Sequence, residues 1–432
     1  MIEHRNAVAF VSWAHSAFSK EDFAGVIAST SICFDLSVFE LFAPLTSGGR
    51  VILVDNALAL GQLDAAVAPT LINTVPSVMT ELLGLKEFPP TIRTANLAGE
   101  PLNTALVQEI YQQTNTQHVH DLYGPSETTT YSTYALRTGD GVQTIGRPIA
   151  NSQIYILDRH MSPVPVGIPG ELYIGGDGVA RGYINRPQLT AEKFLANPFR
   201  AEEGGRLYKT GDLARYLPDG NIQFIGRVDN QVKIRGYRIE LGEIEAVLTR
   251  HPQVTNAVVT VREDSPGDKR LVAYVVATEK EEFQANELRQ FLKTKLPDYM
   301  VPRAFINLAS LPLTASGKIN HKALPPPDEA ELEVQKEFAA PRTQVEASLA
   351  QIWSEVLKLQ KVGIHDNFFE LGGHSLLATQ VISRIRSAFN LEIPLRTLFE
   401  SPTIDELAVA VTHMRDKEPV SNSPPIDRRK RN

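Results

Sequence analysis

The chain has 432 residues, which is enough for more than one domain, and 43% of them are hydrophobic and 22% charged, as in ordinary globular proteins. Its formal net charge of −7 argues against a general nucleic-acid binder and against a basic membrane-surface protein. The one cysteine, Cys33, excludes an internal disulfide and a cysteine-rich zinc site. No apolar run has the length of a membrane span and no signal-peptide core follows the N-terminus, so we expect a cytoplasmic chain with no membrane partner.

The first 110 residues alternate strand-like runs with helix-like segments. The apolar runs at residues 25–30, 50–54 and 71–76 have the length of buried strands, and helix-like pieces at residues 38–43 and 63–68 lie between them. This alternation predicts an α/β layered domain with a mostly parallel sheet.

Residues 140–228 are denser in glycine and proline and have shorter strand-like runs, which predicts a β-rich subdomain. Within this part, the turn sequence Leu217-Pro-Asp-Gly-Asn predicts a hairpin. Residues 230–328 then predict a smaller α+β unit, with strands near residues 256–261 and 271–276 and a helix near residues 287–295.

A proline- and acid-rich run that begins at Leu324 predicts a linker. After it, Leu349, Ile352, Trp353 and Val356 fall on one face of a helix, and two more amphipathic helices follow, which predicts a helical bundle. The end of the chain has prolines, serines and charges without periodicity and is expected to be a linker or disordered tail. The expected segments are therefore residues 1–228, 229–328, a linker at 329–342, 343–412 and the tail at 413–432.

The segment at residues 226–245 mixes strand and helix signals. Its strand-like spacing is broken at Gly236, and a helical period begins at Glu243. A glycine between two strand-like runs marks a bend or a close approach of the backbone to another group. Because cations and acids alternate here, the local pattern alone favours a solvated, charged hairpin.

Ser375 lies in the run Asp366-Asn-Phe-Phe-Glu-Leu-Gly-Gly-His-Ser-Leu, where two glycines lead into a predicted helix. The free N–H groups at a helix start favour a phosphate. An ordinary N-cap serine is the structural alternative. A hydrolase nucleophile elbow is excluded, because it needs a glycine at the position of Leu377.

This run resembles the attachment motif of peptidyl carrier domains in nonribosomal peptide synthetases. The resemblance implies that Ser375 carries a 4′-phosphopantetheine arm, whose thiol holds an aminoacyl group as a thioester. It also implies a phosphopantetheinyl transferase and neighbouring synthetase domains, such as a condensation domain, as partners.

Upstream segments resemble the amino-acid adenylation domain of the same synthetases, and they occur in the order of that family. The matching runs are Leu122-Tyr-Gly-Pro-Ser-Glu-Thr-Thr, Gly170-Glu-Leu-Tyr-Ile-Gly-Gly-Asp-Gly-Val-Ala-Arg-Gly-Tyr, Tyr208-Lys-Thr-Gly-Asp-Leu, residues 226–245, Leu296-Pro-Asp-Tyr-Met-Val-Pro and Ser316-Gly-Lys-Ile-Asn. The resemblance covers about residues 1–412 and implies an α/β plus α+β multidomain chain. Its parts would be an adenylate-forming large subdomain at 1–228, a small subdomain at 229–328 and a helical carrier domain at 343–412.

The resemblance assigns roles in joining an amino-acid carboxylate to the α-phosphate of ATP. Two anions meet in this step, so cations and Mg²⁺ must offset their repulsion. The implied roles are adenine packing for Tyr123, phosphate contact for Ser126, Mg²⁺ binding for Glu127, ribose binding for Asp212 with Arg227 nearby, and catalysis for the cation of Lys318. The structural alternatives are turn chemistry for Glu127 and Asp212 and an exposed loop for Lys318.

Two further roles concern movement between reaction steps. Asp229 would be a hinge between the large and small subdomains. Gly236 would line the path of the pantetheine thiol, since a bare glycine permits close approach.

The substrate pocket is also assigned by resemblance. Asp35 would pair with the substrate α-ammonium, with a helix N-cap as its structural alternative. The other pocket positions are uncharged: Leu36, Phe39, Asn73, Asn96, Ala98, Leu122, Thr130 and Tyr131. A charged substrate side chain would lack a partner there, so we expect a small neutral amino acid, alanine first and glycine next.

The family has a glycine-rich phosphate loop before the position that Met1 resembles, and no such loop is present in this chain. We therefore expect the chain to be part of a larger synthetase, with an N-terminally truncated large subdomain. Two alternatives remain: an inert truncated product in which only the carrier works, and an acyl-CoA ligase, against which Asp35 and the fused carrier argue.

Overall fold

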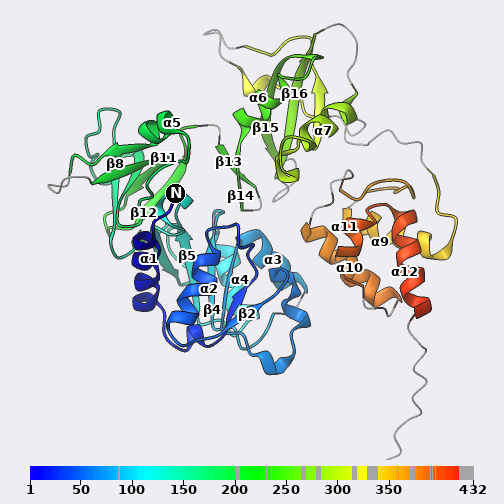
Figure 1. Ribbon diagram of the computed structural model, residues 1–432, viewed down its shortest axis with the longest axis horizontal. Helices are drawn as coiled ribbons and strands as arrows, with labels where there is room; N and C mark the ends of the chain where they lie inside the picture. Colours follow the sequence, from blue (N-terminus) through cyan, green and yellow to red (C-terminus); the bar gives the residue numbers. More distant parts are fainter. Residues whose placement is uncertain are drawn as a thin grey trace, which may run out of the picture. The chain divides into compact units, whose positions relative to one another are not determined.

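The computed structural model forms two compact units, each described by itself. The first comprises Met1–Arg250, Val261–Arg270 and Leu292–Met300, and the second comprises His251–Thr260, Leu271–Phe291 and Val301–Asn432. Figure 1 labels their elements in chain order. The structure describes residues 1–85, 88–199, 205–229, 231–234, 236–263, 269–278, 284–313, 319–327, 339–357, 359–369, 371, 373, 375–389, 391, 393–394 and 396–417.

The first unit contains a seven-stranded sheet with the order β2-β1-β3-β4-β5-β6-β7. The first five strands in this order are parallel to one another, and β6 pairs antiparallel with both β5 and β7. The mostly parallel sheet predicted from the sequence is therefore present. The strands are β1 (Val26–Ala28), β2 (Val51–Leu53), β3 (Leu71–Thr74), β4 (Thr94–Ala98), β5 (His118–Tyr123), β6 (Thr133–Arg137) and β7 (Arg147–Pro148). The helices are α1 (His4–Ala17), α2 (Ser37–Thr46), α3 (Pro76–Leu85) and α4 (Thr104–Gln113).

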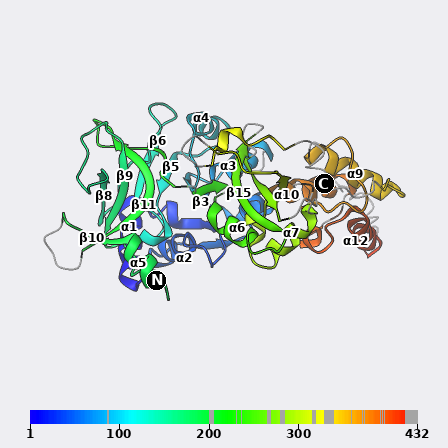
Figure 2. The same ribbon diagram turned by 90° about the horizontal axis from the view of Figure 1, so that it is seen from above.

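Helices lie on both faces of this sheet, and Figure 2 shows α4 on the side opposite α1 and α2. Phe10 and Trp13 of α1 and Phe39 of α2 belong to one buried cluster with Leu71 of β3 and Leu122 of β5. Side chains alternate between the faces of a strand. Alternate residues of β3, β4 and β5 therefore point into the layer beneath α1 and α2.

One sequence expectation fails in this unit. Residues 63–68 are helix-like in sequence but form only a short 3-10 turn, η3 (Ala65–Val67). Ala68 takes a left-handed conformation with φ +46, which ends the turn. Other 3-10 turns of the unit are η1 (Asp22–Gly25), η2 (Ala57–Gln62), η4 (Ser126–Thr128) and η5 (Asp298–Met300).

A second, antiparallel sheet has the order β10-β11-β9-β8, with β12 also paired to β11. The predicted Leu217-Pro-Asp-Gly-Asn turn joins β11 to β12. The elements are β8 (Ser152–Leu157), β9 (Gly170–Gly176), α5 (Pro187–Lys193), β10 (Phe194–Ala196), β11 (Arg206–Tyr216) and β12 (Ile222–Arg227).

The segment at residues 226–245 forms a two-stranded hairpin followed by a helix. The hairpin consists of β13 (Gln231–Ile234) and β14 (Tyr237–Glu240), and Gly236 has φ +78 between them. The bend predicted at Gly236 is therefore present. The helix α6 (Leu241–Leu248) begins slightly before the predicted start at Glu243.

A three-stranded sheet has the order β15-β16-β17, with strands Val254–Glu263, Lys269–Ala277 and Ala304–Asn307. Helix α7 (Ala285–Lys293) lies between β16 and β17 in the chain, and the 3-10 turn η6 (His321–Ala323) follows β17. Within the second unit, Val258, Val272, Tyr274, Ile306 and Leu324 form one buried cluster.

The second unit also contains a helical bundle, drawn from orange to red in Figure 1. Its helices are α9 (Gln344–Leu357), α10 (Ser375–Phe389), α11 (Arg396–Glu400) and α12 (Ile404–Lys417). The predicted apolar faces meet in one core that includes Leu349, Trp353, Val381, Ile385 and Leu407. Across the described ranges, every helix is too short or too polar to span a bilayer.

Candidate active site

The centre of the candidate site is the turn between β5 and β6. Gly124 fits there because a Cβ would lie 2.5 Å from the carbonyl oxygen of Thr130. Thr129 and Thr130 have φ +67 and +68, a left-handed conformation that β-branched residues rarely adopt. Such strain costs about 1–3 kcal/mol per residue and is typical of functional sites. The turn carries Ser126, Glu127 and Thr130, three of the residues with a predicted role in the site.

Tyr123, at the end of β5, is tied to the predicted ribose-binding residue. Its hydroxyl donates to Oδ2 of Asp212 on β11, and both side chains are buried. Burial and the nearby Asp212 carboxylate raise the pKa of Tyr123 well above its ordinary value. The structure therefore shows a hydrogen-bonding role for Tyr123 that the sequence did not predict.

Arg227 joins the ribose residue to the predicted hinge. Its Nη1 donates to Oδ1 of Asp212 at 2.6 Å, across the β11–β12 ladder in which the two residues face each other. Its Nε and Nη2 donate to the two oxygens of Asp229, each at 2.6 Å. Although burial opposes it, the pairing with Arg227 holds the pKa of Asp229 below its ordinary value. One guanidinium thus serves two carboxylates.

The β13–β14 hairpin brings two more cations to this turn. Arg238 Nη1 donates to Oε2 of Glu127 at 2.8 Å, and Tyr183 donates its hydroxyl to Oε1 at 2.7 Å. Burial alone would raise the pKa of Glu127, but Arg238 and then Tyr183 hold it below its ordinary value. The Nζ of Lys233 lies 5.7 Å from the centre of the Tyr123 ring, a cation–π arrangement.

These contacts of Lys233, Arg238 and Tyr183 were not predicted from the sequence. The cations were visible in the segment at residues 226–245, but Glu127 and Arg238 are 111 residues apart and no periodic pattern links them. Only the tertiary fold shows that they meet.

Gly236 sits where the hairpin approaches the large sheet. A Cβ on Gly236 would lie 2.7 Å from Cγ1 of Val75, and a Cβ on Gly99 would lie 3.6 Å from the Cα of Gly236. Next to it, the Tyr237 ring stacks on Tyr299 with centroids 4.3 Å apart and meets Phe34 edge-on at 6.4 Å. The backbone at Gly236 therefore lies close to Val75 and Gly99, and its role in the path of the thiol stays a prediction.

Asp35 lies directly against the β5–β6 turn. Ser126 Oγ donates to Oδ2 of Asp35 at 2.5 Å, and Thr130 Oγ1 donates to the Asp35 carbonyl oxygen at 3.1 Å. Burial raises the pKa of Asp35. The alternative interpretation as a helix N-cap is wrong, because the cap position of α2 is Leu36 and no side-chain cap bond forms.

The remaining pocket positions gather beneath α1 and α2. Phe39, Leu122 and Tyr131 share a buried cluster, against which Leu36 and Ala98 pack. Asn96 Nδ2 donates to Oδ1 of Asn73 at 3.0 Å, and Asn96 Oδ1 faces Nδ1 of His120, also at 3.0 Å. Burial lowers the pKa of His120 to about 4, so its ring is neutral near pH 7.

Two buried polar atoms of this region have no partner among the described residues, the Nδ2 of Asn73 and the hydroxyl of Tyr131. Buried polar groups are otherwise almost always paired. A ligand with polar atoms would satisfy them, and this fits the predicted substrate pocket.

Lys318 falls outside the described residues, so its predicted role stays a prediction. Ser375 is the first residue of α10, and its side chain is likewise not described. Just before it, a Cβ on Gly373 would overlap the Phe368 ring at 2.3 Å. Only a glycine therefore fits at position 373, and Ser375 follows at the N-terminus of a 15-residue helix. The N–H groups of a helix N-terminus favour a phosphate, so this position fits a phosphodiester at Ser375.

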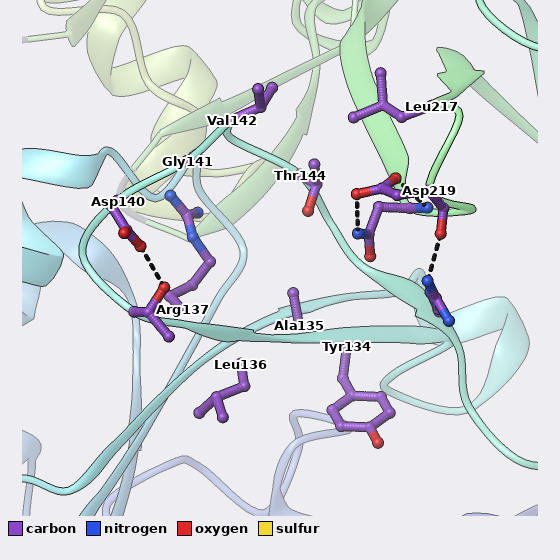
Figure 3. Close-up of a pocket in the computed structure, with 13 residues that line it drawn as sticks. Tyr134, Ala135, Leu136, Arg137, Asp140, Gly141, Val142, Thr144, Leu217 and Asp219 are labelled. Atoms are coloured by element: carbon purple, nitrogen blue, oxygen red, sulfur yellow. Dashed lines mark hydrogen bonds between the residues drawn. The ribbon is translucent and has the colours of Figure 1, made fainter.

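A separate cavity in the first unit contains none of the predicted site residues. It is lined mainly by β6, the β6–β7 connection and the β11–β12 turn, as Figure 3 shows. Several of its polar groups already bond one another: Arg147 donates to the Asp219 carbonyl oxygen, and Asn221 donates to an Asp219 carboxylate oxygen. The candidate site is therefore not this cavity.

Three known families match parts of the chain. The AMP-binding enzyme family matches residues 1–184, and the C-terminal domain of the AMP-binding enzymes matches residues 243–318. The phosphopantetheine attachment site family matches residues 347–411.

Similar proteins include a linear gramicidin synthase of Brevibacillus parabrevis, 53% identical over 99% of this chain and 8% of that protein. A dimodular nonribosomal peptide synthase of Bacillus subtilis (strain 168) is 45% identical over 92% of this chain and 17% of its own length. The chain thus spans a small part of the curated relatives it matches.

Among solved structures, holo-PA1221, an NRPS protein containing adenylation and PCP domains bound to a vinylsulfonamide inhibitor, is 27% identical with a TM-score of 0.70. That match covers 92% of this chain and 67% of the other. The Vibrio cholerae adenylation domain AlmE, in complex with glycyl-adenosine-5'-phosphate, is 27% identical with a TM-score of 0.64, over 74% of this chain and 61% of the other. The chain belongs to the nonribosomal peptide synthetase family, and it combines the two regions of the AMP-binding enzymes with a phosphopantetheine attachment domain.

Proposed function

We propose that this chain activates a small neutral amino acid as aminoacyl-AMP and loads it on the arm at Ser375. The observation that carries the proposal is that Asp35 contacts Ser126 of the β5–β6 turn, which also carries Glu127, and that Asp212 and Arg227 are joined to Tyr123 where this turn begins. These residues come from separate parts of the chain, and together they offer groups for an ammonium, a phosphate, a metal and a ribose.

In the first step, a carboxylate oxygen of the amino acid attacks the α-phosphate of ATP, and pyrophosphate leaves with the electrons of the broken P–O bond. Asp35 would hold the α-ammonium and Ser126 would donate to a phosphate oxygen. Asp212, with Tyr123 and Arg227 as its neighbours, would accept from the ribose hydroxyls. Mg²⁺ supplies charge neutralisation when bound, and Glu127 would be its ligand.

In the second step, the small subdomain would turn about Asp229. Before the turn, Lys318 would face the adenylate, and after it Gly236 and its neighbours would line the path of the thiol. The arm, held through Ser375, would supply the thiol for this step, in which the thioester would form as the bond to AMP breaks and AMP leaves. A hinge of this kind needs only a few residues at an element boundary.

The amino acid is small and neutral in this proposal, with alanine first and glycine next. Leu36, Phe39, Ala98, Leu122 and Tyr131 supply apolar walls, and the described pocket positions offer no charge to a substrate side chain. The partners would be the amino acid, a phosphopantetheinyl transferase and adjoining synthetase domains. The transferase needs CoA and the first step needs ATP, so we place the protein in the cytoplasm.

ATP–pyrophosphate exchange over a panel of amino acids tests the first step. Alanine or glycine should give the strongest exchange, and strongest exchange with a charged or large aromatic amino acid would contradict the proposed pocket. If no amino acid gives exchange but the carrier accepts phosphopantetheine, the result would favour the alternative in which only the carrier works.

The carrier is tested separately. Incubation with CoA and a phosphopantetheinyl transferase should add one phosphopantetheine to the intact mass of the chain. Ser375→Ala should remain unmodified, and modification of that variant would contradict the assigned site. Thioester formation with free CoA, but not with the carrier, would support the acyl-CoA ligase alternative.

A further inference from the structure

The Glu127 carboxylate is engaged on both oxygens by protein groups. Tyr183, which holds Oε1, follows β9 in the large part of the first unit. Arg238, which holds Oε2, belongs to the β13–β14 hairpin beyond the predicted hinge at Asp229. The Tyr183 contact is independent of the hairpin, whereas the Arg238 contact requires the hairpin to be docked.

A metal ion bound at Oε2 of Glu127 would lie close to the guanidinium of Arg238, which donates to the same oxygen. Mg²⁺ binds carboxylate oxygens at about 2.1 Å. A metal on Oε2 and a guanidinium donating to it would be close enough to repel strongly in this little-exposed site. The Glu127 side chain is only 12% exposed while the hairpin is docked, so a divalent cation or water must compensate its charge when Arg238 leaves.

We infer that Arg238 and a divalent cation compete for Glu127, so that metal binding and docking of the β13–β14 hairpin exclude each other. This inference rests on the proposed role of Glu127 as the Mg²⁺ ligand. Loss of the metal together with pyrophosphate would then free Glu127 for Arg238 and bring Gly236 to its place beside Val75. The ion exchange would link the end of the first step to the arrangement needed for the second.

The composition of the site agrees with such an exchange. Within the described ranges, no group of three or more His, Cys, Asp or Glu side chains forms a metal cage. A Mg²⁺ ion held by one carboxylate and substrate phosphates is released more readily than a caged ion. Arg238 has a second contact, to the Tyr208 hydroxyl at 3.3 Å, which orients it toward Glu127.

By linkage, each competitor must weaken the other by the same factor. The affinity for Mn²⁺ can be measured by electron paramagnetic resonance on the full chain, with and without ATP. Arg238→Gln should tighten Mn²⁺ binding about fivefold or more, as expected for a coupling of this kind. Arg238→Lys keeps the positive charge but loses the forked pair of donors, so its Mn²⁺ affinity should lie between those of the unmodified chain and Arg238→Gln.

Arg215→Gln is the matched control, because Arg215 is a cation of β11 that donates to Gln223 and not to Glu127. It removes one positive charge and should leave Mn²⁺ affinity near that of the unmodified chain. If Arg215→Gln and Arg238→Gln raise the Mn²⁺ affinity equally, the change in net charge alone explains the effect. That result would overturn the competition between Arg238 and the cation.

Hydrogen exchange of residues 231–240, followed by mass spectrometry, gives the reciprocal readout. Mn²⁺ should speed exchange in the unmodified chain. Arg238→Gln and Glu127→Gln should exchange fast with or without Mn²⁺. An unmodified hairpin that binds Mn²⁺ and keeps the same exchange rate would overturn the inference.

Equilibrium dialysis with labelled ATP separates this result from the proposed function. ATP binding without any effect of Mn²⁺ on the hairpin contradicts the competition alone. Absence of ATP binding contradicts the proposed activation step. The Mn²⁺ affinity and the hydrogen exchange, both measured without ATP, then still decide whether Arg238 and the cation compete. Absence of Mn²⁺ binding counts against the competition.

Discussion

Arg227 and Arg238 each pair with a carboxylate of the candidate active site, but the first pair lies within one sheet and the second joins two separate elements. Arg227 and Asp212 face each other across the β11–β12 ladder, with side chains 13% and 7% exposed. Arg238 of the hairpin is 34% exposed and reaches Glu127 in a distant turn. The first pair can open only if the sheet opens. The second can open whenever the hairpin moves, so the same chemistry serves as a fixed support in one place and as a switchable contact in the other.

The largest effect is expected from Arg227→Ala. This change leaves Asp212 buried without its cation and frees Asp229, so the free energy of unfolding should fall by about 4 kcal/mol. Urea unfolding near neutral pH measures it. Arg215→Ala, on the same strand as Asp212, is the control and should cost less than about 1 kcal/mol. A loss as small as that of the control would show that the pair is not a fixed support.

Glu40 shows what a buried carboxylate does without an arginine. Its oxygens accept from the backbone N–H and the hydroxyl of Thr30, at 3.0 and 3.1 Å. Burial raises the pKa of Glu40 to about 7, and the bonds from Thr30 oppose this only in part. The contrast with Glu127, whose pKa is lowered, shows the effect of the missing guanidinium.

The pH dependence of stability follows from this raised pKa. The folded state holds the Glu40 proton more tightly than the unfolded state, so the contribution is full below the ordinary pKa of 4.5 and is lost as the pH rises through about 7. Glu40→Gln keeps the shape of the side chain; its amide oxygen can accept from the Thr30 N–H, and its amide nitrogen can donate to the Thr30 hydroxyl. Relative to this variant, the unmodified chain should lose about 3 kcal/mol between these limits. Unfolding of both chains across this range measures the difference, and parallel pH profiles would contradict it.

A smaller effect is expected at the hairpin turn. Gly236→Ala places a Cβ at 2.7 Å from Val75 and forces alanine to φ +78. The docked hairpin should lose about 2 kcal/mol, seen as faster hydrogen exchange of residues 231–240. Gly242→Ala in α6 is the matched control, because a Cβ there meets nothing within 4 Å. Equal exchange in the two variants would contradict close docking of the hairpin.

The parts of the site that follow local rules could be predicted from the sequence. The bend at Gly236, the strand pattern of the first unit and the apolar faces of the bundle depend on residues close together in the chain. The contacts of Glu127 could not be predicted, since Tyr183 reaches it from the segment after β9 and Arg238 from β14, and no spacing rule joins them. The bond from Tyr123 to Asp212 was missed for the same reason, because it joins two different sheets.

The smallest effect on overall stability is expected from Arg238→Gln. The hairpin can lift when the guanidinium is lost, and water can then reach Glu127, so the free energy of unfolding should fall by about 1 kcal/mol or less. Urea unfolding of this variant beside Arg227→Ala measures the contrast directly. The double variant with Glu127→Gln should regain part of the loss, since no unpaired carboxylate then remains. A loss as large as that of Arg227→Ala would mean that the hairpin is held as firmly as the sheet, and Arg238 would then be a fixed support like Arg227.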